Sequence, residues 1–343
     1  MNNLISHCPV WLRFVSASVL LSLTLTTSHP LEAAQRVRLG TLAPKGSSYF
    51  NELNRMGAEW RKATSGSVSL TIYPDGRMGG ESQMVRRMRV GQLQAGFLSA
   101  VGLTEIEPAV SGLQDLPLMF HSLDEVDHIG SKLQPLLEEQ LAKKGFKVLF
   151  WVNAGWVHFF TKTPITTPDE LRKLKLFSWA GSPEVVDIYK SAGMNPVPLE
   201  TKDIIPGLQT GMISAVPMPP LIANATQVDT KAPYMLDLNW APLVGAAVIT
   251  TKTWNRLQPA TKASVIQIAE AAGERIQRIG REEAIKSVAA MKKRGLKVTT
   301  VTPEARKLWQ AAADEVYPQI RGTIVPAKTF DLVQESLREY RQK

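Results

Sequence analysis

The sequence predicts an α/β protein made of two domains. Over residues 145–220, short apolar runs alternate with capped helical segments, which is typical of βαβ units that build a mostly parallel sheet. The length of 343 residues favours two domains over one. Hydrophobic residues make up 44% of the chain and charged residues 21%, an ordinary globular composition with ample material for a core.

Residues 1–34 are predicted to be a secretory signal peptide. Arg13 precedes an apolar run over residues 14–25, and small residues follow, so we expect cleavage near Ala33 or Ala34. The run is too short for a stable membrane helix, which predicts an exported, periplasmic protein. The only cysteine, Cys8, precedes the run, so the mature chain is expected to lack disulfides, thiol nucleophiles and cysteine-bound metals.

The first part of the mature chain alternates between predicted strands and helices. Residues 35–42 and 67–73 alternate apolar and polar side chains, as strands with one buried face do, and residues 95–100 form a small apolar strand. A helix with a stripe of apolar residues starts near Ser48 and ends at Gly66.

The central stretch, residues 145–220, is predicted to supply the side chains that contact the ligand. Strands are expected over residues 148–152, 157–161 and 174–179, and helices start at Thr167 and Ser182. In open α/β sheets, ligands bind outside the carboxyl ends of the strands. The side chains at the strand ends of this stretch are Trp151, Asn153, Trp156, Phe177, Trp179 and Met218.

The last part is predicted to hold two strands, over residues 234–240 and 244–250, and then a long helix. The helix covers residues 259–294, interrupted only by Gly273 and Gly280. At about 1.5 Å per residue it would be roughly 50 Å long, which exceeds one small domain, so we expect it to bridge two. A further strand over residues 296–301 and two helices complete the chain.

Charge and motifs argue against several functions. The net charge of +9 is dispersed over amphipathic helices, so no nucleic-acid partner is predicted. No nucleophile elbow, zinc-protease, Walker or dinucleotide-binding motif occurs, so neither an enzyme nor a cofactor is predicted. A hydrolase that uses His158 stays an alternative. The acids after His121 fit the first turn of a helix, so no metal site is predicted.

An ordered set of segments resembles the DctP-type solute receptors of TRAP transporters. The set consists of residues 60–96, DLPLMF at 115–120, PITTPDELRKLKL at 164–176, NPVPL at 195–199, LQTGMISAV at 208–216, and the long helix after TTKTWNRL at 250–257. The resemblance implies two lobes with mixed sheets flanked by helices, as in periplasmic binding proteins, and a long helix spanning both lobes. It also implies one ligand between the lobes and delivery to small and large permease subunits in the membrane.

The expected lobes follow from these segments. Residues 35–153 form the first lobe and residues 154–242 the second. Residues 243–258 return to the first lobe as a strand, 259–294 form the bridging helix, and 295–343 pack on the lobes.

Two departures from the family pattern shape the ligand hypothesis. Phe177 stands where the family's acid-binding members carry an arginine, and Met218 stands where an Asn is frequent. Because a phenyl ring cannot replace an arginine fork on a carboxylate, we expect a mainly apolar or neutral ligand, oriented by Asn153 and Tyr49.

Two first-lobe residues complete the candidate contacts, and two alternatives stay open. Asp75 and Arg77 lie in a first-lobe turn and are added as contacts. Arg77 keeps a small organic acid as an alternative ligand. A stand-alone periplasmic carrier of lipophilic molecules is the other alternative function.

Overall fold

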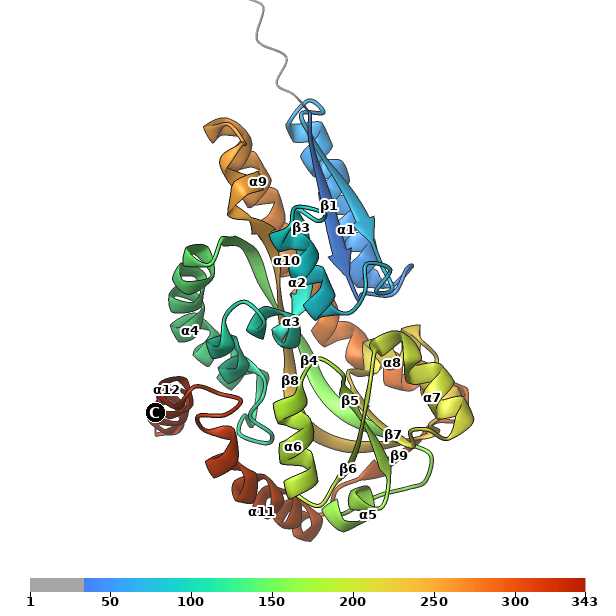
Figure 1. Ribbon diagram of the computed structural model, residues 1–343. Helices are drawn as coiled ribbons and strands as arrows, with labels where there is room; N and C mark the ends of the chain where they lie inside the picture. Colours follow the sequence, from blue (N-terminus) through green and yellow to red (C-terminus); the bar gives the residue numbers. More distant parts are fainter. Residues whose placement is uncertain (1–33, 343) are drawn as a thin grey trace, which may run out of the picture. The chain divides into compact units, whose positions relative to one another are not determined.

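The structure, a computed structural model, describes residues 34–342 as one α/β unit around a single mixed sheet (Figure 1). The sheet has nine strands in the order β2-β1-β3-β8-β4-β7-β5-β6, and β9 pairs with β8. The α/β fold class is therefore confirmed, although the strands join in one sheet. The predicted signal peptide, including Cys8, lies outside the described residues apart from Ala34.

One end of the sheet is built from the first part of the chain. Its parallel strands are β1 (Gln35–Thr41), β2 (Val68–Tyr73) and β3 (Ala95–Ser99). The helices that connect them and follow them are α1 (Ser48–Ala63), α2 (Glu81–Arg89), α3 (Ala100–Thr104), the 3-10 helix η1 (Pro108–Leu113) and α4 (Leu123–Lys143). The predicted start of α1 is confirmed, because the Ser47 hydroxyl accepts a hydrogen bond from the Phe50 N–H at 3.3 Å.

The other end of the sheet comes from the central stretch. Its strands are β5 (Lys175–Trp179), β6 (Asn195–Leu199) and β7 (Ala215–Met218), and β5 runs parallel to both neighbours. The helices of this part are α5 (Pro168–Arg172), α6 (Pro183–Ser191), η2 (Thr201–Asp203), α7 (Ile204–Thr210), α8 (Pro220–Ala225) and η3 (Val228–Thr230).

Two long strands join the ends of the sheet. β4 (Phe146–Thr161) and β8 (Tyr234–Thr250) pair antiparallel along their length. The prediction of two separate strands in each stretch was wrong, because β4 and β8 each continue through the expected break, and in β4 that break is a β-bulge. The register shifts between Asn153 and Trp156, where Gly155 adopts a φ of 89° that favours glycine.

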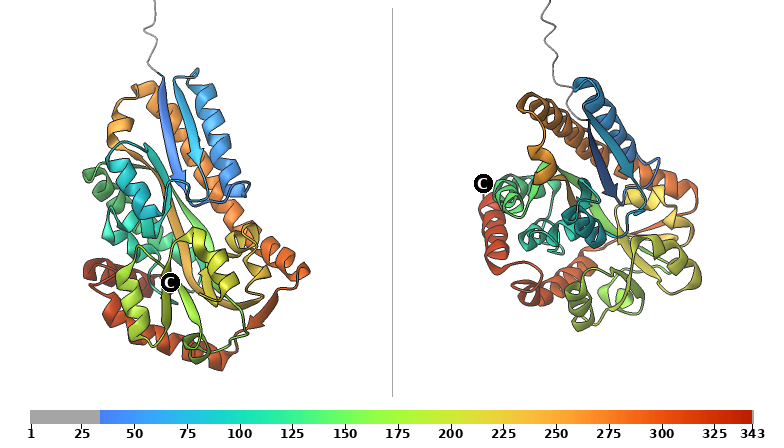
Figure 2. Two further views of the ribbon diagram at one scale, coloured as in Figure 1. Left: turned by 45° about the vertical axis from the view of Figure 1, so that its right-hand side comes forward. Right: turned by 45° about the horizontal axis from the view of Figure 1, so that its top comes forward.

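The long helix is confirmed as α10 (Pro259–Lys293), 35 residues without interruption. It contacts α1 and β4 and then α8, so it packs on both ends of the sheet (Figure 2). Gly273 and Gly280 do not interrupt it. A Cβ at Gly273 would lie 2.7 Å from Phe150 Cβ, and one at Gly280 would lie 2.7 Å from the Tyr49 hydroxyl, so both glycines let the helix approach its neighbours closely.

The C-terminal part adds α9 (Thr251–Asn255) before α10, and then β9 (Lys297–Thr300), α11 (Pro303–Ile320) and α12 (Ala327–Arg341). α11 contacts α5 and α6, whereas α12 contacts α4 and η1. Trp309 of α11 is fully buried and donates a hydrogen bond to the Thr166 carbonyl at 2.8 Å. The C-terminal helices therefore touch both the first part of the chain and the central stretch.

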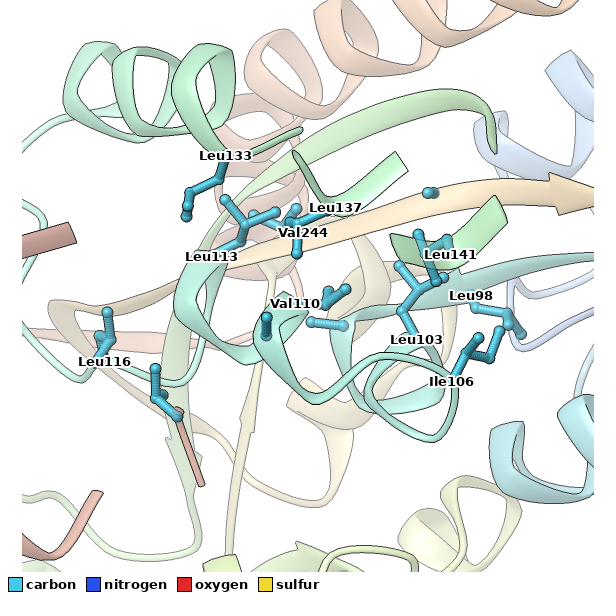
Figure 3. Packing of buried hydrophobic residues seen from close by; sticks show 14 of the residues in the cluster. Leu98, Leu103, Ile106, Val110, Leu113, Leu116, Leu133, Leu137, Leu141 and Val244 are labelled. Atoms are coloured by element: carbon cyan, nitrogen blue, oxygen red, sulfur yellow. The ribbon is translucent and has the colours of Figure 1, made fainter. Parts of the chain in front are cut away.

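One apolar cluster holds η1 in place against α4 and β8 (Figure 3). Val110 and Leu113 of η1 are buried against Leu133 and Leu137 of α4 and against Val244 of β8. The residues that directly follow η1 are consequently anchored to the core, and these residues line the candidate site.

Candidate functional site

A cavity of about 600 Å³ lies between α3 and η1 on one side and β5 and α6 on the other. Pro217 of β7 and the turn between α11 and α12, with Thr323 and Ile324, complete its walls. This volume is within the range typical of small-molecule sites.

The first wall of the cavity is positioned by a buried carboxylate. Glu81 of α2 accepts hydrogen bonds from the N–H groups of Ser99 and Gly102, at 2.7 and 3.0 Å, and from the Ser99 hydroxyl at 2.5 Å. Burial is the largest influence on this group and raises the pKa of Glu81, while these hydrogen bonds lower it. Glu81 thus holds the start of α3 in place beside the cavity.

The second wall is the end of β5. Phe177 and Trp179 pack edge to face, with ring centroids 5.2 Å apart, and the Trp179 indole N–H donates to the Thr201 hydroxyl at 3.3 Å. Ser178 between them is 1% exposed, and its hydroxyl has no hydrogen-bond partner among the described residues. A buried hydroxyl that lines a cavity without a partner is a candidate contact for a polar ligand atom.

Asp115 and Tyr189 line both this cavity and a smaller apolar recess, so they lie at the inner end of the cavity, where the two meet. Asp115 directly follows the anchored η1 region and forms no ion pair with any described residue, while Gln114 before it accepts the Val244 N–H at 3.0 Å. Burial raises the pKa of Asp115 to about 7, and a hydrogen bond with the Gln114 side chain lowers it. Burial and the charge of Asp115 raise the pKa of Tyr189 to about 12.

The charges around the cavity are predominantly acidic. Glu105, Asp115 and Glu184 line it, and among its lining residues there is no Lys, Arg or His. An adjoining cavity of about 280 Å³ shares Glu105 and Trp179 with it and contains Arg86. Arg86 is exposed, and its side chain makes no hydrogen bond or ion pair within residues 34–342.

An apolar recess of about 110 Å³ opens behind Asp115 and Tyr189. Ile188, Met194 and Trp240 are among its lining residues. Arg172 also lines it, but this side chain is hydrogen bonded to the Ala192 carbonyl and to Asp169. The site thus combines a cavity lined by polar and apolar residues in about equal share with an apolar recess, rather than the mainly apolar pocket that the sequence suggested.

Of the predicted contact residues, Phe177, Trp179 and Met218 lie in or next to the cavity wall formed by β5. Phe177 and Trp179 line the cavity. Met218 is 6% exposed and packs in the core behind β7, whereas its neighbour Pro217 reaches the cavity. Ligand contact by these residues stays a prediction.

The structure places two of the predicted tryptophans away from this cavity. Trp151 lines a different cavity, of about 630 Å³ between α4 and α10, and its indole N–H donates to Glu138 at 3.0 Å. Trp156 packs against the cluster around η1. The reason is the bulged course of β4, which turns these side chains toward the helices on its faces.

The remaining predicted contacts also lie outside the cavity. The Asn153 side-chain oxygen accepts the Gly155 N–H at 3.1 Å, so the side chain stabilises the bulge. Tyr49 is 4% exposed and packs against Phe97. Asp75 accepts the Lys45 N–H at 2.9 Å, and neither Asp75 nor Arg77 lines any of the cavities described above.

Sequence reasoning missed the polar residues of the cavity. Asp115 was inside a segment that resembled the family, and Ser178 lay between two proposed contacts, yet neither was selected. An acid directly before the apolar run of residues 116–120 was the available signal for Asp115. No sequence pattern distinguishes Ser178 from an ordinary strand serine.

Residues 34–342 offer neither a metal site nor a membrane span. No group of three His, Cys, Asp or Glu side chains there is arranged to hold a metal ion. No helix in this range is long and apolar enough to cross a membrane.

A cavity between two α/β parts that are joined by crossing strands and one long helix defines a two-lobed solute-binding protein. The family model described as bacterial extracellular solute-binding protein, family 7, matches residues 39–322. The chain belongs to this family, as the resemblance predicted, and is a TRAP solute-binding receptor. Members of the family are periplasmic, substrate-binding receptors and not enzymes.

Two curated relatives are similar over most of their length. The 2,3-diketo-L-gulonate-binding periplasmic protein YiaO of Escherichia coli is 24% identical, over 85% of this chain and 88% of the relative. The C4-dicarboxylate-binding periplasmic protein DctP of Rhodobacter capsulatus is 24% identical, over 86% of this chain and 87% of the relative.

Solved structures support the same fold. A TRAP periplasmic solute-binding protein from Ralstonia eutropha with bound (S)-2-acetolactate has a TM-score of 0.82 at 18% identity, over 89% of this chain and 99% of that chain. One from Sulfurospirillum deleyianum with bound succinate has a TM-score of 0.81 at 19% identity, with the same coverages. The two-lobed fold class is thereby confirmed.

Proposed function

We propose that this receptor captures a small organic acid in the cavity between η1 and β5 and delivers it to a separate TRAP permease pair in the membrane. The family assignment carries the proposal, together with a cavity of about 600 Å³ in which a single small solute fits. The predicted lobes would close on the solute and release it again at the permease.

The acid class is supported by what the relatives are named for. YiaO is named for 2,3-diketo-L-gulonate and the Rhodobacter protein for C4-dicarboxylates, and solved neighbours hold acetolactate, succinate and L-galactonate. All of these ligands are small and polar. The names of these relatives favour the organic-acid alternative over the mainly apolar ligand that the sequence suggested.

A carboxylate in this site needs a cation, because an enclosed carboxylate without one carries a desolvation penalty of several kcal/mol. Phe177 does not supply it, and Arg77 lies outside the cavity. Arg86 is the best candidate: it lines the adjoining cavity, which shares Trp179 and Glu105 with the main one, and its guanidinium has no other partner among the described residues. An arginine fork would hold the carboxylate through two hydrogen bonds.

Calorimetry against succinate, L-galactonate and a panel of lipophilic compounds tests this proposal. We expect at least one acid to bind, and Arg86→Gln to weaken it by roughly tenfold or more, the loss of a charge-assisted contact of about 1.5–3 kcal/mol. Arg87→Gln is the matched control, since Arg87 lies on the same helix, bonded to Gln92, and does not line the cavity. Tight binding of a lipophilic compound and of no acid would restore the apolar hypothesis.

Native mass spectrometry of the purified protein tests the receptor function without a choice of ligand. A co-purified small molecule that leaves on mild denaturation is the expected result. Permease genes of the small and large type beside this gene would support delivery to a TRAP permease over a stand-alone carrier.

A further inference from the structure

We propose that the ligand carries a protonated amine in addition to its carboxylate, and that Asp115 receives the amine at the inner end of the cavity. This inference rests on the proposed function and names the chemical class of the solute. The acid end would face Arg86 and the amine end would face Asp115, so the ligand would be a small amino acid in the broad chemical sense.

The charge distribution of the cavity is the first argument. Glu105, Asp115 and Glu184 line it without a Lys, Arg or His among the other lining residues. Glu105 accepts a hydrogen bond from the Ser82 hydroxyl at 2.5 Å and is exposed at the rim, as is Glu184. A purely anionic solute would be repelled from this wall, whereas a solute with a cationic group would be attracted to it.

The position of Asp115 is the second argument. Its backbone is anchored through the Ser111 carbonyl at 2.7 Å, and it makes no ion pair among the described residues. Asp115 is half-buried, and a carboxylate that loses part of its hydration without a charge partner is destabilised. An ammonium group of the ligand would supply the missing charge partner in this position.

Ser178 gives a second, independent sign of a ligand. Its hydroxyl lines the same cavity, is 1% exposed and has no hydrogen-bond partner within residues 34–342. The apolar surface between the two polar positions comes from Phe177 and Trp179, and Trp179 also lines the cavity of Arg86. Aromatic faces also favour a neighbouring cation. The cavity therefore offers an acceptor, a hydroxyl and an aromatic wall to a single elongated solute.

Matched pairs of probes that differ only in an amine or a hydroxyl test the inference. The pairs are 4-aminobutyrate with 4-hydroxybutyrate and 5-aminovalerate with 5-hydroxyvalerate, in which the two groups lie at opposite ends of the molecule. We expect an amine member to bind roughly tenfold or more tightly than its hydroxyl partner, the size of a charge-assisted hydrogen bond. In Asp115→Asn the preference should disappear, while the far-UV circular dichroism stays unchanged.

Asp187→Asn is the matched control, because Asp187 lies on α6 with Tyr189, is exposed and lines none of the cavities at this site. It should keep the preference for the amine. Equal or tighter binding of the hydroxyl members, no binding of any amine probe, or a preference that survives Asp115→Asn would each overturn the inference. If the protein binds succinate, or co-purifies with an acid that has no amine, the proposed receptor function is supported and only the proposal of an amine-bearing ligand is rejected.

Discussion

At the residue scale, Phe177 decides which residue can bind a carboxylate in the proposed site. Phe177 stands where acid-binding relatives were expected to carry an arginine, and it is fully buried against Trp179. Because Phe177 carries no charge, the proposed contact with a carboxylate must come from another residue, and among the residues lining the described cavities Arg86 is the only arginine without a partner. The acids Asp115 and Glu105 then become the dominant charges beside the aromatic wall.

Asp115 makes stability depend on pH. Its pKa is raised from 3.8 to about 7 by burial, so the folded state binds its proton more tightly than the unfolded state. Its contribution to stability is fully present below about pH 4 and is lost as the pH rises through about 7. Urea unfolding of the ligand-free protein should therefore show Asp115→Asn gaining stability over wild type as the pH rises from 4 to 7, with a constant difference above pH 8. A difference that does not vary with pH would contradict this.

Trp309 should be one of the most costly side chains to remove. It is fully buried, stacks on Phe159 with ring centroids 5.8 Å apart, and donates to the Thr166 carbonyl. We expect Trp309→Ala to destabilise by about 3–5 kcal/mol in chemical unfolding. Trp309→Phe keeps one aromatic ring in the site and loses the hydrogen bond and part of the packing, so it should cost clearly less than Trp309→Ala. Equal losses would show that the ring packing matters little.

At the scale of elements, the long antiparallel pair of β4 and β8 joins the two ends of the sheet. Bulges interrupt its register near Asn153 and Val157, and the Asn153 side chain satisfies the Gly155 N–H at the bulge. α10 packs on β4, and its Gly273 and Gly280 allow a close approach to Phe150 and Ala154 of that strand. The connection between the ends of the sheet is thus a strand pair with local irregularities, braced by one helix.

Gly273 is required by packing. A glycine in a helix normally costs about 0.5–1 kcal/mol relative to alanine. Here the added Cβ would lie 2.7–2.8 Å from Phe150, so Gly273→Ala should destabilise by about 1–3 kcal/mol instead. A double-mutant cycle with Phe150→Leu, measured by thermal unfolding, should reveal coupling between the two sites. Additive effects would mean that the helix shifts to accommodate the methyl group.

At the scale of the whole molecule, the candidate site is open to solvent between two walls that belong to distant parts of the sequence. α3 and η1 form one wall and β5 with α6 form the other, and the turn between α11 and α12 closes a third side. Such an arrangement permits capture by closure of the walls. The division into lobes at residues 153 and 242 remains a prediction.

Closure should be visible as compaction. Small-angle scattering of wild type with a saturating ligand, found by calorimetry, should give a smaller radius of gyration than without it. Arg86→Gln at the same ligand concentration should stay closer to the open value, because it binds less. An unchanged radius for wild type at saturation would argue that the walls are already in their final position.

The sequence by itself determined the fold class, the long helix, most strand positions and the family. These follow from local periodicity, helix caps and an ordered set of segments, all of which act within a short stretch of chain. It also placed Phe177 and Trp179 at a strand end, where they now line the cavity.

Only the tertiary structure decided which side chains share the cavity. Asp115, Ser178 and Tyr189 come together because η1, β5 and α6 meet across the sheet, a contact between residues more than 60 positions apart. Trp151 lines the cavity between α4 and α10, and Asn153 bonds to Gly155 at the bulge of β4, so neither reaches the candidate site. The role of Gly273 and Gly280 in α10 also depends on distant residues, because each glycine makes room for a side chain far away in the sequence, Phe150 or Tyr49. No local sequence pattern predicts such a contact.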